Sequence, residues 1–183
     1  MPQKSPPPHS SPVIAVATLT IVGVLEVVLG LCLLLPTLWV AGTTYSDKYI
    51  THTSHSGYFD FSDLVLTGAL SIAGAQLAPI LGGAAAVVTA ALLRNPDHRR
   101  AQWIAAGACV ALPAVVGIAS LAIPVVWTLQ THATPDRTET ATFFGSLGAA
   151  YSGQAFLIGV ALAFLALWGQ RRSSASLDAP LDD

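Results

Sequence analysis

Four long apolar runs limit what this chain can fold into more than any other feature. They lie at residues 13–42, 64–93, 103–127 and 143–168, and each exceeds the roughly 20 residues that a helix needs to cross a bilayer. None contains Lys, Arg or Asp, and none alternates apolar and polar residues like a membrane β-strand. Charged residues make up only 10% of the chain, against about 25% in soluble domains. The sequence therefore predicts an all-α fold, an integral membrane four-helix bundle.

The remaining sequence is short. Residues 1–12 are rich in proline and serine and residues 171–183 in serine and aspartate, so we expect two disordered tails around one domain at 13–170. A cleaved signal peptide is the competing interpretation of the N-terminus. Its apolar part spans about 7–15 residues, whereas the first run here is about twice that length.

Basic residues indicate how the helices are oriented. One side of the predicted bundle carries six cations and the other side only Lys48 and Arg137, so the positive-inside rule places both termini in the cytoplasm. Aromatic residues at the run ends, such as Trp39 and Trp103, agree with this topology. Abundant alanine, glycine and valine with little lysine favour a bacterial cytoplasmic membrane.

Glu26 lies in the middle of the first run and is its only charged residue. An ionised carboxylate at the bilayer centre costs about 2.5–3.5 kcal/mol on insertion scales, so we expect a neutral, hydrogen-bonding acid. Helical spacing places Gly23 and Gly30 on the same stripe as Glu26, and small residues allow another helix to approach closely. Glu26 is therefore predicted to face the bundle rather than the lipid.

Two glutamines lie near the middles of other runs. Gln76 shares a stripe with small residues in the second run, and Gln154 lies in the fourth run with Tyr151 close beside it. We expect Glu26, Gln76, Gln154 and Tyr151 to form an intramembrane polar cluster. The favoured interpretation is interhelical hydrogen bonding, and the alternative is a proton or cation relay.

The connection between the first two runs is the most distinctive polar stretch. His52 and His55, with His132 from the connection between the third and fourth runs, could supply ligands for zinc or copper. The spacing matches no recognised metal motif, so a solvated or partner-binding loop is the competing interpretation. No cofactor is expected.

The cytoplasmic connection carries the basic residues Arg94, Arg99 and Arg100. Contact with anionic lipid headgroups explains this cluster without a specific ligand. The expected partners are the lipid bilayer and other membrane subunits or a second copy of the chain, and no nucleic acid is expected.

The second half of the sequence repeats features of the first. A proline and a tryptophan three residues apart close both the first and the third run, at Pro36–Trp39 and Pro124–Trp127. The even-numbered runs each carry a glutamine that follows small residues. Two pseudo-repeated helical hairpins, related by an axis along the membrane normal, would give this pattern, and chance alignment of Ala- and Gly-rich helices would also give it.

Four helices with inner termini and a larger first outer loop resemble the claudin-like tetraspans in topology. That family carries Gly-Leu-Trp followed by two cysteines in the first outer loop, and this loop has none, so we do not assign the chain to it. The sequence favours a non-enzymatic accessory or scaffolding subunit that acts through helix–helix and outer-loop contacts. The alternative function is a small proton- or cation-coupled transporter or channel that uses Glu26.

Overall fold

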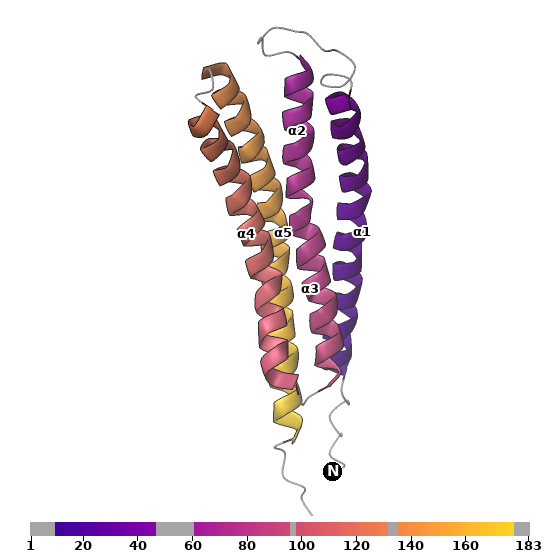
Figure 1. Ribbon diagram of the computed structural model, residues 1–183. Coiled ribbons are helices and arrows are strands. Elements are labelled where there is room, and N and C mark those ends of the chain that lie inside the picture. Colours follow the sequence, from indigo (N-terminus) through magenta and orange to yellow (C-terminus); the bar gives the residue numbers. More distant parts are fainter. Residues whose placement is uncertain (1–9, 47–60, 96–97, 132–134, 178–183) are drawn as a thin grey trace, which may run out of the picture.

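The computed structural model describes residues 10–46, 61–95, 98–131 and 135–177, and this part of the chain is helical (Figure 1). Its helices are α1 (Ser10–Ser46), α2 (Phe61–Ala75), α3 (Leu77–Leu93), α4 (Arg99–Thr131) and α5 (Pro135–Leu177). Helices α2 and α3 follow one another along a single span, so four helical bodies are long and apolar enough to cross a membrane. The prediction of an all-helical protein with four membrane-length helices is confirmed.

Prolines lie at the helix starts and within the helices. Pro12 lies in the first turn of α1 and Pro135 begins α5, where the backbone N–H has no intrahelical acceptor to lose.

Helix α5 continues to Leu177, beyond the expected end of the span at residue 168. The residues after position 168 include helix formers such as Gln170 and Arg171, and the first proline after the span is Pro180. The helix can therefore extend past the end of the apolar run.

The second span is interrupted at Gln76, between α2 and α3. Pro79 lies three residues later; it has no N–H to donate to the Ala75 carbonyl, and its ring crowds that carbonyl. Backbone bonds from Gln76 to Ile72 (3.1 Å) and from Ile80 to Gln76 (3.4 Å) carry the chain across the interruption. The span therefore continues in the same general direction after a local break.

The helices associate as two pairs. Helix α4 shares its most extensive interface with α5, and α1 packs mainly on α3. Figure 1 shows the pairs diverging toward the end at which α1 finishes and α2 begins. The buried core near the other end consists largely of small residues: Leu19, Ala85, Ala86, Ala90, Ala106, Cys109, Leu162 and Ala166. Small residues dominate because lipid offers no hydrophobic drive for helix association, so close backbone approach must supply the contact.

Candidate functional site

Glu26 lies on the buried face of α1, as its small-residue stripe predicts, and only 8% of the residue is exposed. The wall opposite is α3, and Glu26 Cβ lies beside Gly83: a Cβ built on that glycine would be 2.9 Å away. Gly23 and Gly83 also approach so closely that a Cβ on either one would meet the other's carbonyl oxygen, at 2.6 and 2.5 Å. Glycine at both positions therefore allows α1 and α3 to enclose the acid.

Gln76, at the junction of α2 and α3, is also buried against α1, but at a different depth from Glu26. Its carbonyl oxygen lies opposite Gly30, whereas Glu26 lies opposite Gly83. The seven residues from Gln76 to Gly83 rise about 10 Å along the helix. Among the described residues, neither Glu26 Oε1 nor Gln76 Oε1 has a hydrogen-bond partner. The two buried side chains therefore do not form the expected pair.

Gln154 lies on the exposed face of α5, and Tyr151 is half-buried beside it. The structure does not bring Gln154 together with Glu26 and Gln76 within one copy, and its neighbours on the same stripe, Leu147 and Ile158, are exposed as well. The opposite face of α5 consists of smaller residues and can approach the other helices more closely. That difference in size, rather than the polarity of Gln154, sets the rotation of the helix.

A periodic pattern of small residues on α5 would have revealed this rotation. From Ala141 to Gly169, the buried residues of α5 recur at alternating intervals of four and three, which is the period of left-handed helix packing. These residues are Ala141, Gly145, Gly148, Ser152, Ala155, Gly159, Leu162, Ala166 and Gly169. Gly159 marks the closest approach, because a Cβ there would overlap the Cys109 carbonyl of α4. Sequence reasoning missed this stripe because it used the polarity of Gln154 to choose the buried face.

A buried polar pair joins α3 and α4. Thr89 and Cys109 are fully buried, and their side-chain oxygen and sulfur are 3.8 Å apart. Thr89 Oγ1 donates to the Ala85 carbonyl (2.7 Å), and the Cys109 thiol donates to the Ala105 carbonyl (3.4 Å). Thr89 and Cys109 therefore form a buried polar contact between α3 and α4, which sequence reasoning did not identify.

A second polar group lies where α3 ends and α4 begins. Gln102 is 3% exposed, and its Nε2 donates to the carbonyls of Leu92 and Asn95, both at 2.9 Å. Its Oε1 accepts a bond of 2.9 Å from Gln170 Nε2 on α5. One side chain thus satisfies carbonyls at the end of α3 and connects α3, α4 and α5. Its position next to the basic residues gave no sign of this role in the sequence.

Replacing Gln102 with leucine is expected to destabilise the protein by about 1–3 kcal/mol, because the carbonyl groups of Leu92 and Asn95 each lose a donor. The measurement is the apparent unfolding temperature in a mild detergent. Gln170→Leu is the matched comparison, since it removes the bond between the two amides and leaves the two carbonyl contacts of Gln102 in place. A larger loss for Gln170→Leu than for Gln102→Leu would contradict this account.

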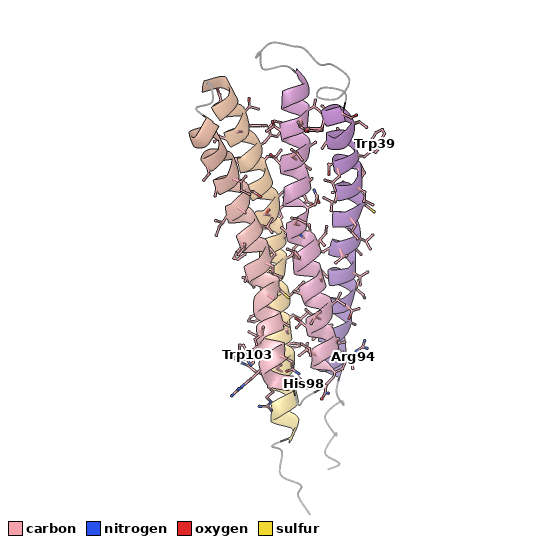
Figure 2. All side chains as sticks on the ribbon, viewed as in Figure 1. Trp39, Arg94, His98 and Trp103 are labelled. Atoms are coloured by element: carbon pink, nitrogen blue, oxygen red, sulfur yellow. The ribbon has the colours of Figure 1, made fainter. Side chains whose placement is uncertain are left out.

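The basic residues lie at the same end as this group. Arg94, Arg99, Arg100 and Arg171 are exposed, and Trp103 beside them is 58% exposed. Figure 2 shows Arg94, His98 and Trp103 at one end of the bundle and Trp39 toward the other. Trp39 is 72% exposed. This arrangement suits the two interfaces of a bilayer, where tryptophan rings and arginines lie at headgroup level.

The proposed metal ligands His52, His55 and His132 lie outside the described residues. Within the described ranges, no group of three or more His, Cys, Asp or Glu residues could hold a metal ion. The metal-site prediction remains untested.

A groove of about 300 Å³ opens between α2 and α4, and Leu77 of α3 and Phe144 of α5 complete its lining. Its lining is apolar apart from Ser71 and Ser120. Ser120 already donates to the Val116 carbonyl (2.8 Å), so its hydroxyl is satisfied within α4. Neither Glu26 nor Gln76 lines this groove. The groove therefore offers no polar route to the buried acid.

Comparisons with protein-family models, with curated proteins and with solved structures gave no match. The functional argument therefore rests on the geometry of this chain.

Proposed function

We propose that the protein is a non-enzymatic accessory or scaffolding subunit of a membrane assembly, acting through contacts of its helices and its outer loop. The observation that supports this proposal is the closed packing around Glu26. Gly23 and Gly83 bring α1 and α3 into backbone contact at the level of the acid. A pathway for ions needs polar groups along its length, and the groove between α2 and α4 does not contain the acid.

The second candidate is a small transporter or channel that uses Glu26. It is supported by Glu26 Oε1, which has no hydrogen-bond partner in the described part of the chain, because buried polar atoms without partners are rare and are often functional. The same oxygen is equally available to a hydrogen bond that forms on association with a partner. Packing around the carboxyl favours the first function over this one.

Both termini and the connection between α3 and α4 face the cytoplasm of a bacterial cell in this proposal. The exposed arginines at that end support the orientation through the positive-inside rule. A thiol-labelling assay on intact cells tests it: a cysteine placed at His98 should resist a membrane-impermeant reagent until the cells are opened. Labelling of the cysteine in intact cells would show that the protein has the opposite orientation.

A parallel duplication of two helical hairpins belongs to the same proposal. The repeated Pro–Trp spacing supports it, since both copies fall near the same end of their helices. The two halves have diverged in one respect: the interruption at Gln76 has no counterpart in α5, which is continuous. Agreement of the α1–α3 and α4–α5 crossing angles would favour duplication over chance.

Replacing Glu26 with glutamine separates the two functions. Glutamine keeps the size and one hydrogen-bonding oxygen of the acid but cannot release a proton. For a scaffold, we expect the variant to keep its unfolding temperature within about 2 °C and to retain its association with partners. Vesicles containing the wild-type protein should show no proton or cation flux above protein-free vesicles. Flux that is present in the wild-type protein and abolished in Glu26→Gln would contradict the scaffolding function and favour a transporter.

A further inference from the structure

We propose that the chain self-associates through the face of α5 that carries Gln154, so that the partner is a second copy of the same protein. This inference rests on the proposed scaffolding function and names its partner. We use the term Gln154 face for five exposed residues on one side of α5: Leu147, Ala150, Gln154, Ile158 and Ala161.

Gln154 lies at a depth where neither water nor lipid headgroups can satisfy its amide. The fourth candidate span runs from Glu139 to Arg171, so Gln154 is close to its centre. The hydrocarbon core of a bilayer is about 30 Å thick, so a residue at its centre is about 15 Å from either headgroup layer, beyond the reach of a glutamine side chain. The described part of the chain provides no hydrogen bond to this amide. An exposed amide at this depth is unfavourable unless another protein covers it.

The amide group itself selects a second copy as the partner. It carries both a donor and an acceptor, so two glutamine side chains can exchange two hydrogen bonds. Copies inserted in the same orientation are related by a two-fold axis along the membrane normal, which places identical residues at identical depths. Gln154 of one copy therefore meets Gln154 of the other when the axis passes beside the Gln154 face. A different partner would need its own polar group at the same depth.

The surface around Gln154 permits close approach of another helix. Ala150 and Ala161 are small and lie about one and two turns from the glutamine. Small residues beside a polar group are the combination that drives helix association in membranes. Helix α5 thus has one small-residue face for its own bundle and a second face with the chemistry for self-association.

Cysteine cross-linking tests the geometry. Cys32 is a free, exposed thiol, so it is first replaced with alanine (Cys32→Ala). In that full-length background, Ala150→Cys and Ala161→Cys should each give a disulfide-linked dimer when oxidised in vesicles of phosphatidylethanolamine and phosphatidylglycerol. Ile118→Cys is the matched control, because it is also an exposed apolar position on a helix but lies on α4. Equal cross-linking at Ile118 and at the two α5 positions would overturn the proposal.

Substitution of the glutamine tests the energetics. Dimer dissociation would be followed in the same vesicles by energy transfer between labelled copies as lipid is added. Gln154→Leu should weaken association about three- to thirtyfold, the range expected for loss of interhelical amide hydrogen bonds. Gln154→Asn, which keeps a self-complementary amide, should retain part of it. Unchanged association in Gln154→Leu, or a wild-type protein that is monomeric at all dilutions, would refute self-association through this face.

The two proposals fail in different ways. If the wild-type protein is monomeric and shows no ion flux, self-association is refuted, and the scaffold must bind a different protein. Flux that depends on Glu26 removes the scaffold whether or not the dimer forms.

Discussion

Gly159→Ala is expected to destabilise the protein by about 2–3 kcal/mol, although it adds only one methyl group. The new Cβ would overlap the carbonyl oxygen and carbon of Cys109, which belong to the backbone of α4 and cannot rotate away. Either α5 must move or Cys109 must shift, and both disturb the most extensive helix interface of the bundle. Overpacking of this kind costs about 1–3 kcal/mol in well-packed interiors.

The matched control lies six residues earlier on the same helix. Gly153→Ala places a methyl group where nothing lies within 4 Å, and alanine favours a helix over glycine by about 0.8–1 kcal/mol. We therefore expect Gly153→Ala to be neutral or stabilising. The measurement is the apparent unfolding temperature of purified protein in one detergent, where Gly159→Ala should fall by about 5–10 °C. A loss of similar size in both variants would show that α5 is not held at Gly159.

Gly23→Ala and Gly83→Ala are expected to separate α1 from α3, each at a cost of about 1–3 kcal/mol. Each new Cβ would meet the carbonyl oxygen of the other glycine, at 2.6 and 2.5 Å. The Gly83 methyl would in addition press on Glu26 Cβ, at 2.9 Å. Because both substitutions force apart the same two backbones, the double variant should lose less stability than the sum of the single losses.

A double-mutant cycle measures that difference. Residues in direct contact show interaction energies of about 0.5–3 kcal/mol, whereas distant sites add within about 0.5 kcal/mol. Gly42→Ala on α1 and Gly74→Ala on α2 are the controls, since a Cβ at either position meets nothing within 4 Å. Additive losses for Gly23 and Gly83 would contradict the close approach that encloses Glu26.

The spans and the orientation of Glu26 were predictable because both depend on the composition of single helices. Length and hydropathy identify a membrane helix without knowledge of its neighbours. Gly23 and Gly30 then select the face of α1 that can approach another helix, and α3 packs there. Pro79 gave a comparable local reason for the interruption at Gln76.

The rotation of α5 was difficult to predict from the sequence, because two faces of that helix carry suitable signals. One contains Gln154 and the other a regular series of small residues, and both recur with a period near 3.5. Polarity favours burial of the first face, whereas close packing favours the second. In the structure, packing determines the rotation, and the alternating intervals of four and three residues could have shown this in advance.

The Thr89–Cys109 and Gln102–Gln170 contacts lay beyond sequence reasoning for a different reason. Each joins residues on different helices, so it depends on the rotation and depth of two helices together. Gln102 is close to the basic connection in sequence and looked like the boundary of a span. Its 3% exposure follows from the way α5 covers it, which no local pattern records.

The Gln102 contacts also imply an order of events during synthesis. The bonds from Gln102 to Leu92 and Asn95 join residues seven to ten positions apart, so they can form once the hairpin of α3 and α4 has left the ribosome. The bond from Gln170 spans 68 residues and must wait for nearly the whole of α5. An inserted chain lacking its last helix would therefore have a satisfied hairpin end but an uncovered Gln102 oxygen. That oxygen would remain without its Gln170 donor until the last helix packs against α4.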